Sequence, residues 1–130
     1  MEPIDRTRIY ELMNKYSFSG ATLRSFRVQH RSKSQLNATL VISLLNKNRT
    51  KRYRLKIVFF NVVEFRFQKR PNSSLKRISD VRMAFFNEQF FMNLDPYEEI
   101  GLPTVADFRN SDAFLGSERA EYELEEILKK

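Results

Sequence analysis

The sequence predicts an α+β fold, in which an antiparallel β-meander sheet carries an amino-terminal helix packed on one face. The first residues repeat apolar side chains with the period of a helix, whereas most later segments alternate apolar and polar side chains. The links between these segments are short and polar, and none has room for the crossover helix of a parallel sheet. With 130 residues and 42% hydrophobic content, the chain is expected to form a single α+β domain over residues 1–130.

A helix is predicted near residues 3 to 16. Pro3 suits the first turn of a helix, and Gly20 lies beyond its end. One face carries apolar residues at the i, i+3, i+4, i+7 spacing: Ile9, Leu12, Met13 and Tyr16.

Period-two alternation predicts the strands. It runs through residues 36–45, 53–59, 63–67 and 81–85, and the short apolar run 89–94 adds a further strand. In each alternating segment one face is expected to be buried and the other to face solvent.

The join between two of these strands allows two structures. Residues 53–67 keep apolar side chains on odd numbers, with polar Asn61 in the middle. Either residues 60–62 form a three-residue turn that pairs Ile57 with Phe65, or the segment is one bent strand without a turn. We expect the hairpin, because strands usually have roughly 3 to 10 residues. Phe65 is then expected in the core.

The carboxy-terminal third is less regular. Residues 94–108 contain two prolines and one glycine, which predicts a surface loop before a short strand near Val105–Phe108. Residues 114–115, followed by 116–119, are typical of a strand that enters a turn. Residues 118–128 fit both an edge strand and a helix, and the preceding turn favours the strand of a hairpin.

The charge is divided along the chain. Residues 1–82 contain 19 Lys and Arg against 5 Asp and Glu, whereas residues 83–130 contain 4 against 11. The two parts carry +14 and −7, which gives the net charge of +7. A field of one sign attracts partners of opposite charge, so this basic protein is expected to have a binding role.

If residues 60–62 turn, the loops at 46–51 and 69–76 lie at the same end of the sheet and form a basic rim. With a single long strand they separate to opposite ends. The rim can bind an acidic partner or pair internally with the acidic segment 118–126. The predicted partner-binding residues are Lys47, Arg49, Lys51, Arg52, Lys69, Arg70, Lys76 and Arg77.

Residue types argue against catalysis. The chain has no cysteine, its single histidine is His30 at an expected strand end, and its three glycines form no phosphate-binding loop. We therefore predict a protein that is not an enzyme, with no catalytic residues, no metal site and no cofactor. No segment approaches the ~20 apolar residues of a membrane span. A cytoplasmic location without membrane contact is expected.

Nucleic acid is the alternative partner. The basic side chains favour it, but a stacking platform needs basic and aromatic side chains on one face. The aromatic residues alternate oppositely to the arginines and are expected to face the core: Tyr53, Phe59, Phe65 and Phe67. A third alternative is a structural homo-oligomer, in which the basic face of one copy meets the acidic third of another.

Four segments resemble the small immunity proteins of bacterial polymorphic-toxin systems. They are Phe18-Ser-Gly20-Ala21, the run LKIVFFNVVEFRF, Ile78-Ser-Asp80-Val81, and Asp107 to Leu115 before AEYEL. The resemblance implies a small antiparallel α+β domain that neutralises a toxin by stoichiometric binding without catalysis, and it implies that AEYEL is a strand. The chain departs from this pattern in charge, because inhibitors of nucleases are commonly acidic. A nuclease partner would therefore require contact through the acidic third.

Overall fold

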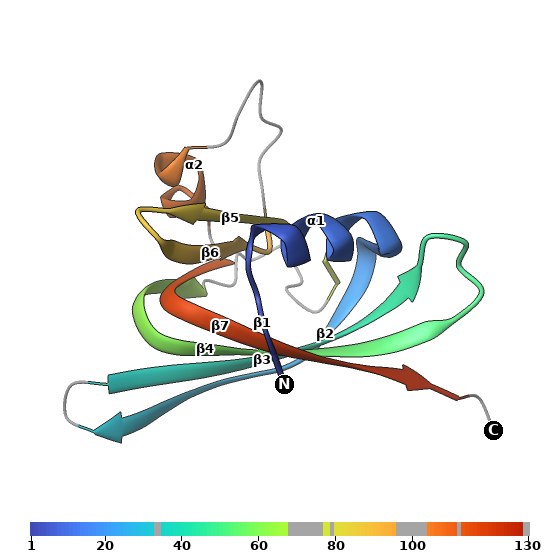
Figure 1. The fold of residues 1–130 in the computed structure, drawn as a ribbon, viewed down its shortest axis with the longest axis horizontal. Helices are drawn as coiled ribbons and strands as arrows, with labels where there is room; N and C mark the ends of the chain where they lie inside the picture. Colours follow the sequence, from blue (N-terminus) through green and yellow to red (C-terminus); the bar gives the residue numbers. More distant parts are fainter. Residues whose placement is uncertain (33–34, 68–76, 79, 96–103, 112, 129–130) are drawn as a thin grey trace.

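The computed structural model describes residues 1–32, 35–67, 77–78, 80–95, 104–111 and 113–128 (Figure 1). Two helices and seven strands lie within these residues. In chain order they are β1 (Glu2–Pro3), α1 (Arg6–Lys15), β2 (Tyr16–Ser32), β3 (Gln35–Asn46), β4 (Arg52–Phe67), β5 (Arg82–Phe86), β6 (Gln89–Asn93), α2 (Val105–Arg109) and β7 (Ala113–Ile127).

The strands form one antiparallel sheet in the order β2-β3-β4-β7-β6-β5, and the short β1 pairs with β7. The antiparallel prediction is confirmed. The meander is wrong, because β7, the last strand in the chain, lies between β4 and β6. In this position β7 pairs with β4 along its whole length, with β6 at residues 114–117, and with the short β1 at Glu121 and Tyr122.

The predicted turn at residues 60–62 is wrong, because β4 continues from Arg52 to Phe67 as one bent strand. Asn61 has φ 55°, and the register with β7 shifts between Val62 and Glu64. Such a bulge bends a strand without ending it. β4 exceeds the usual strand length because its partner β7 is also long and pairs with it through the bend (Figure 1).

The bend curls the sheet until its distant parts meet. Gly20 N donates to Ile78 O at 2.8 Å, and Ile78 N donates to Ala21 O at 2.8 Å, so the chain before β5 hydrogen-bonds to the start of β2. The rings of Phe26 in β2 and Phe67 in β4 stack with centroids 4.1 Å apart. The curl therefore encloses an inner face and leaves an outer face.

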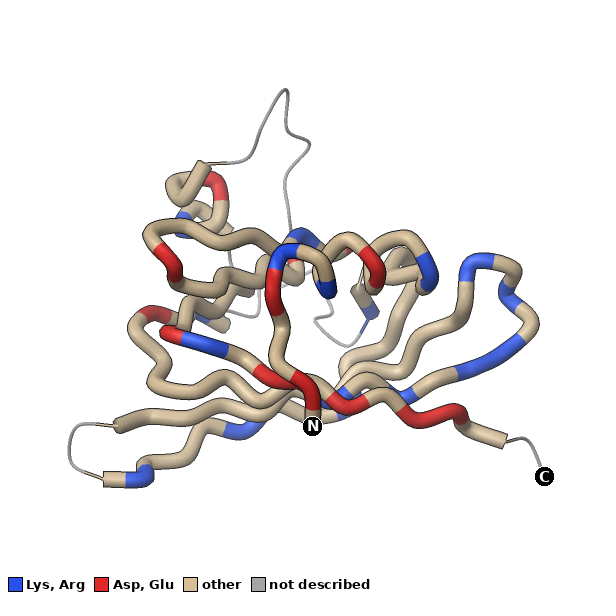
Figure 2. Tube along the Cα trace, viewed as in Figure 1, with Lys and Arg blue, Asp and Glu red and all other residues tan. Residues whose placement is uncertain are grey.

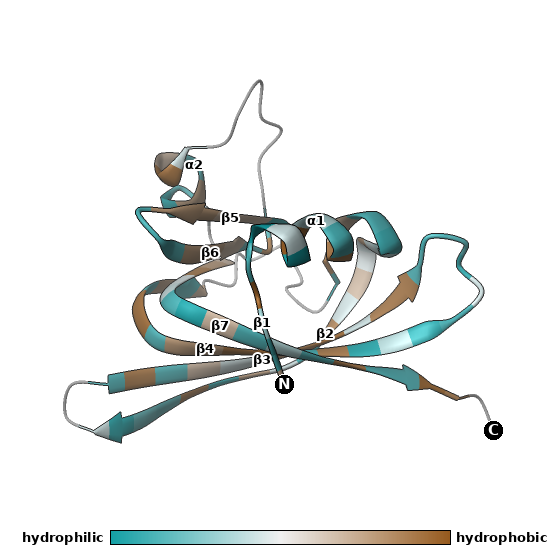
Figure 3. Ribbon diagram, viewed as in Figure 1, coloured by the Kyte–Doolittle hydropathy of each residue, from teal (hydrophilic) through white to brown (hydrophobic). Residues whose placement is uncertain are grey.

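Helix α1 lies over the inner face (Figure 1). It begins at Arg6 rather than residue 3, because the Asp5 carboxylate caps it by accepting from Arg8 N at 2.8 Å, while Pro3 belongs to β1. Leu12 is buried, and Ile9 and Met13 pack against the same core. Hydrophobic and hydrophilic residues alternate along β3 and β4, so the helix covers their apolar side (Figure 3).

A second, smaller core lies on the other side of β5, β6 and β7. Phe91, Phe108 and Phe114 are buried there, with the rings of Phe91 and Phe108 edge to face. The strand predicted near Val105–Phe108 is wrong, since these residues form helix α2. A capping box between Thr104 and Asp107 starts this helix, and burial of Phe108 holds it on the sheet.

Strand β7 runs without a turn through residues 116–119, so the turn predicted there is wrong. The strand predicted for 118–128 is confirmed as far as Ile127. Gly116 is required by packing rather than by a turn, because a Cβ atom built on it would lie 2.5 Å from Phe91 Cε1.

Phe65 is 46% exposed, although the odd-numbered face was expected to be buried throughout. Phe59, on the same face before the bulge, is fully buried. Beyond the bulge between Val62 and Glu64, Phe65 meets Phe26 of β2, with ring centroids 6.4 Å apart, and stays half exposed there, while Phe67 packs against the main core.

Replacement of Gly116 by Ala is expected to destabilise the fold by ~1 to 3 kcal/mol, because the added methyl group overlaps the Phe91 ring. Urea unfolding measures this cost. In a Phe91→Leu background the same substitution should cost less, and an equal cost in both backgrounds would place the strain elsewhere.

Replacement of Phe59 by Ala is expected to cost ~3 to 5 kcal/mol, since it empties a fully buried site. Phe65→Ala should cost about 1 kcal/mol, because roughly half of this ring already faces water. Chemical denaturation of the two variants compares the costs. A larger loss at Phe65 would contradict the described position of the bulge.

Candidate functional site

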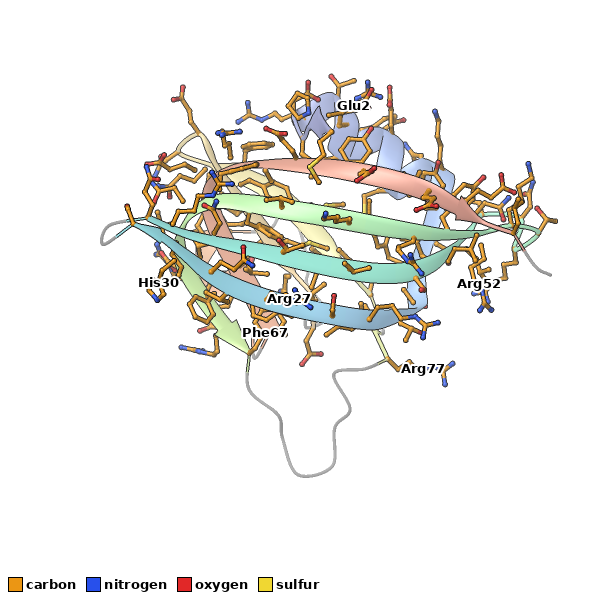
Figure 4. All side chains as sticks on the ribbon, turned by 90° about the horizontal axis from the view of Figure 1, so that it is seen from below. Glu2, Arg27, His30, Arg52, Phe67 and Arg77 are labelled. Atoms are coloured by element: carbon orange, nitrogen blue, oxygen red, sulfur yellow. The ribbon has the colours of Figure 1, made fainter. Side chains whose placement is uncertain are left out.

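The basic rim is only partly assembled. Lys47, Arg49, Lys51 and Arg52 lie together at the turn between β3 and β4, and all four are exposed. Lys69, Arg70 and Lys76 lie outside the described residues. Arg77 pairs with Thr22 at the start of β2, and its side chain points away from the sheet at the same end as Arg52 (Figure 4).

The β3–β4 turn is held by the side chain of Asn46. Its Oδ1 accepts from Thr50 N at 2.9 Å and from Lys51 N at 3.1 Å, and its Nδ2 donates to Thr50 Oγ1 at 3.0 Å. Arg49 has φ 56°, in the left-handed region that favours glycine or asparagine. These bonds fix the backbone from which Arg49 and Arg52 extend.

On the outer face, basic residues of β4 lie beside acidic residues of β7. Ser43 in β3 is opposite Arg54 in β4, which is opposite Glu125 in β7; Lys56 is likewise opposite Glu123. Figure 2 shows Lys and Arg along the turn and the start of β4, with Asp and Glu along the adjoining end of β7. Opposite charges on adjacent strands attract, so β7 partly neutralises Arg54 and Lys56.

Two other arginines have neutral neighbours. Arg52 is opposite Leu45 on one side and Ile127 on the other. Arg24, in β2, donates from Nε to Ser43 Oγ at 2.8 Å. Ser43 is only 7% exposed, so this bond holds the Arg24 side chain against the sheet.

These side chains surround two adjoining hollows. The smaller, about 110 Å³, is lined by Arg24, Arg49 and Arg52 together with hydroxyl-bearing residues of β2 and β3. The larger and more open one, about 520 Å³, adds Arg54 and shares Arg24, Ser43 and Arg52. No Asp or Glu is among the described residues that line either hollow. We refer to Arg24, Ser43, Arg49 and Arg52 as the arginine site.

Sequence reasoning found Arg49 and Arg52 but missed Arg24 and Ser43. Arg24 lies beside an irregularity of β2, where the register with β3 shifts twice between Ser17 and Ser25. An isolated glycine within a strand pattern, here Gly20, is the sequence signal for such a bulge. It does not reveal which neighbouring side chain turns toward Ser43.

Other features of the described residues do not extend the site. They contain no group of three or more His, Asp or Glu that could hold a metal ion. Their helices are too short and too polar to cross a membrane. His30 is exposed at the opposite end of the sheet from Arg52 (Figure 4).

A separate cluster of ionisable groups holds the amino terminus on β7. Tyr122 Oη donates to Glu2 Oε2 at 2.8 Å, and Arg8 Nη2 lies 3.4 Å from the same oxygen. Burial raises the pKa of Tyr122 to about 12, assisted by the hydrogen bond to Glu2 and its negative charge. The cluster ties β1 and α1 to the sheet.

The raised pKa of Tyr122 makes stability depend on pH in the alkaline range. An unfolded tyrosine ionises near pH ~10, whereas Tyr122 in the folded protein ionises at about 12. The unfolded state therefore loses this proton first, and the free energy of unfolding falls as the pH rises from about 10 toward 12. Tyr122→Phe should reduce this fall, as measured by urea unfolding at successive pH values. Tyr10→Phe, at a position 73% exposed, is the control; an equal fall in both variants would contradict the assignment.

Comparison with known proteins leaves the arginine site to be interpreted from its own chemistry. No family model matches the chain, and no curated protein or solved structure is significantly similar to it.

Proposed function

We propose that this protein is a non-enzymatic binding protein that holds an acidic segment of a protein partner against the arginine site. The observation that carries the proposal is the convergence of Arg24, Arg49 and Arg52 around one hollow whose described lining contains no carboxylate. Like charges held close together repel one another, and an anionic partner would remove this repulsion.

The neighbouring strand supports this interpretation. Glu125 and Glu123 are in register with Arg54 and Lys56, whereas Arg52 has only apolar partners across the sheet. The register with β7 therefore places opposite charge beside Arg54 and Lys56 but not directly opposite Arg52. Guanidinium groups bind carboxylates through two parallel hydrogen bonds, which suits recognition of Asp or Glu side chains.

The outer face suits an acidic protein segment better than nucleic acid. A nucleic-acid backbone needs a continuous positive path, but the glutamates of β7 border the basic residues on one side (Figure 2). Phe60 is on the outer face, opposite Arg119 in β7, and the Arg119 guanidinium lies 3.9 Å from the centre of its ring. That ring is therefore covered and cannot stack on a base from this side.

The resemblance to immunity proteins suggests the biological form of this binding. In that form the partner is a toxin, and one copy of the chain neutralises one toxin molecule by covering part of its surface. The hollow's lining of arginines, serines and a threonine supplies hydrogen-bond donors for such an interface.

A fluorescent oligoglutamate peptide tests the proposal. It should bind the purified protein in fluorescence anisotropy, with affinity that falls as salt is added. Reversal of two site residues, Arg24→Glu with Arg52→Glu, should weaken binding at least about a hundredfold, since truncating one partner of a desolvated charge pair costs ~2 to 5 kcal/mol.

The matched control is Arg27→Glu with Arg31→Glu. It makes the same change in net charge on the same strand, β2, at exposed positions outside both hollows. The control should keep most of the affinity, and equal losses in the two variants would show only a long-range field. Tighter binding of single- or double-stranded nucleic acid than of the peptide would support the nucleic-acid alternative. Salt-sensitive self-association in sedimentation would support the homo-oligomer.

A further inference from the structure

We infer that the smaller hollow, at the bulge of β2, binds one phosphate-sized oxyanion with two negative charges. This inference rests on the proposed function and deepens it: carboxylates of the acidic segment would meet the arginines of the larger, open hollow, and the smaller hollow would take one further, doubly charged group. That group is a phosphate monoester or free phosphate, which share the same dianion.

The hollow arises from a break in the β2–β3 ladder. Ser17 pairs with Leu45, and the next paired residues are Thr22 and Ser43. Four residues of β2, 18–21, are therefore opposite a single residue of β3, Leu44. Gly20, with φ 81°, and Ala21 turn instead to Ile78, with which they exchange the two hydrogen bonds described above. The diverted strand leaves a space of about 110 Å³ beside β3, enough for several waters or one tetrahedral oxyanion.

Hydroxyl groups supply neutral donors around this space. Ser17, Ser19, Thr22 and Ser43 all line it. Ser43 is the most constrained of them, because it is 7% exposed and its oxygen accepts from Arg24 Nε at 2.8 Å. A hydroxyl that accepts in this way still has its own proton to donate, and the proton can turn toward a bound oxygen.

Three guanidinium groups supply the charge. Arg24 uses only Nε in its bond to Ser43, and among the described residues no partner is assigned to its two terminal nitrogens. Arg49 and Arg52 approach from the β3–β4 turn, whose backbone is fixed by Asn46. Arg24, which Ser43 already holds in place, loses little conformational entropy when an anion binds.

The balance of charge and size selects the class of anion. A carboxylate has one negative charge and two oxygens in a plane, and it would leave part of this donor set unused. A phosphate monoester carries about −1.5 to −2 charges and three acceptor oxygens at pH 7. A phosphodiester has a single charge and a sugar on each side. The smaller hollow therefore suits the terminal dianion.

Inorganic phosphate tests the inference without any protein partner. In a titration of the isotope-labelled full chain at constant ionic strength, the NMR signals of Arg24 Nε–H and of the amides of residues 17–22 should shift together and saturate. Sodium chloride, added in place of phosphate, should not reproduce the shifts. Shifts that do not saturate, or that spread evenly over all arginines, would overturn the inference.

Two variants assign the site. Arg24→Gln should weaken phosphate binding about tenfold or more, because a hydrogen bond to a charged group contributes ~1.5 to 3 kcal/mol. Ser43→Ala should weaken it severalfold through the lost neutral donor. The matched control is Arg27→Gln, an exposed arginine of the same strand that lines neither hollow, and it should bind phosphate normally. If Ser43→Ala unfolds, the exposed Arg24 position still provides the test. Unchanged binding in folded Arg24→Gln would reject the site.

A second titration distinguishes a phosphate monoester carried by a partner from free phosphate. A peptide with one phosphoserine should bind more tightly than inorganic phosphate if the group is carried by a partner, and equally if the ligand is free phosphate. The inference and the proposed function also fail separately. Oligoglutamate binding without phosphate binding would reject the dianion site alone, and saturable phosphate binding without oligoglutamate binding would reject the acidic-segment function alone.

Discussion

The fold depends on the pairing of β4 with β7, two long strands that remain in contact from Arg52 and Ile127 to Phe67 and Ala113. Both strands bend at the same place, where β4 has its bulge after Val62 and β7 has Gly116 beneath the Phe91 ring. A paired bend keeps the backbone hydrogen bonds that a turn in either strand would lose. The curl of the sheet, the enclosure beneath α1 and the second core beneath α2 all follow from this shared bend.

The same pairing decides what the charges can do. Before the bend, β4 and β7 expose alternate residues on the outer face, so basic positions of one strand meet glutamates of the other. The pairing ends at Arg52 and Ile127, where the partner is apolar. Neutralisation within the sheet consequently stops just before the turn that holds Arg49. The arginine site therefore lies where the described part of β7 places no glutamate opposite Arg52.

Local patterns predicted much of the fold, because α1 and the strands each repeat apolar residues at the spacing of a helix or of a strand. Leu12 and its neighbours mark the buried side of the helix, and Ile42, Leu55 and Ile57 mark the buried side of the sheet. The pairing of strands that are distant in the sequence could not be predicted from the alternation of apolar residues alone. The sequence of β4 keeps the same alternation whether Asn61 bends the strand or turns it, and only the presence of β7 as a long partner decides between them. For the same reason Arg49 and Arg52 could be named in advance, whereas Arg24 and Ser43 could not: their contact depends on the shifted register of β2.

Two unusual backbone conformations border the smaller hollow, and their costs differ. Gly20 adopts φ 81° without a side-chain penalty, which lets β2 leave the ladder at little cost. Arg49 adopts φ 56°, a conformation that costs a residue with a Cβ atom roughly 1 to 2 kcal/mol. Asn46 offsets part of this cost through its bonds to Thr50 and Lys51. Glycine at position 49 would remove the strain but also the guanidinium group. Arginine in place of glycine keeps a third guanidinium group at the hollow that Arg24 and Arg52 also line, which agrees with the proposed anion site.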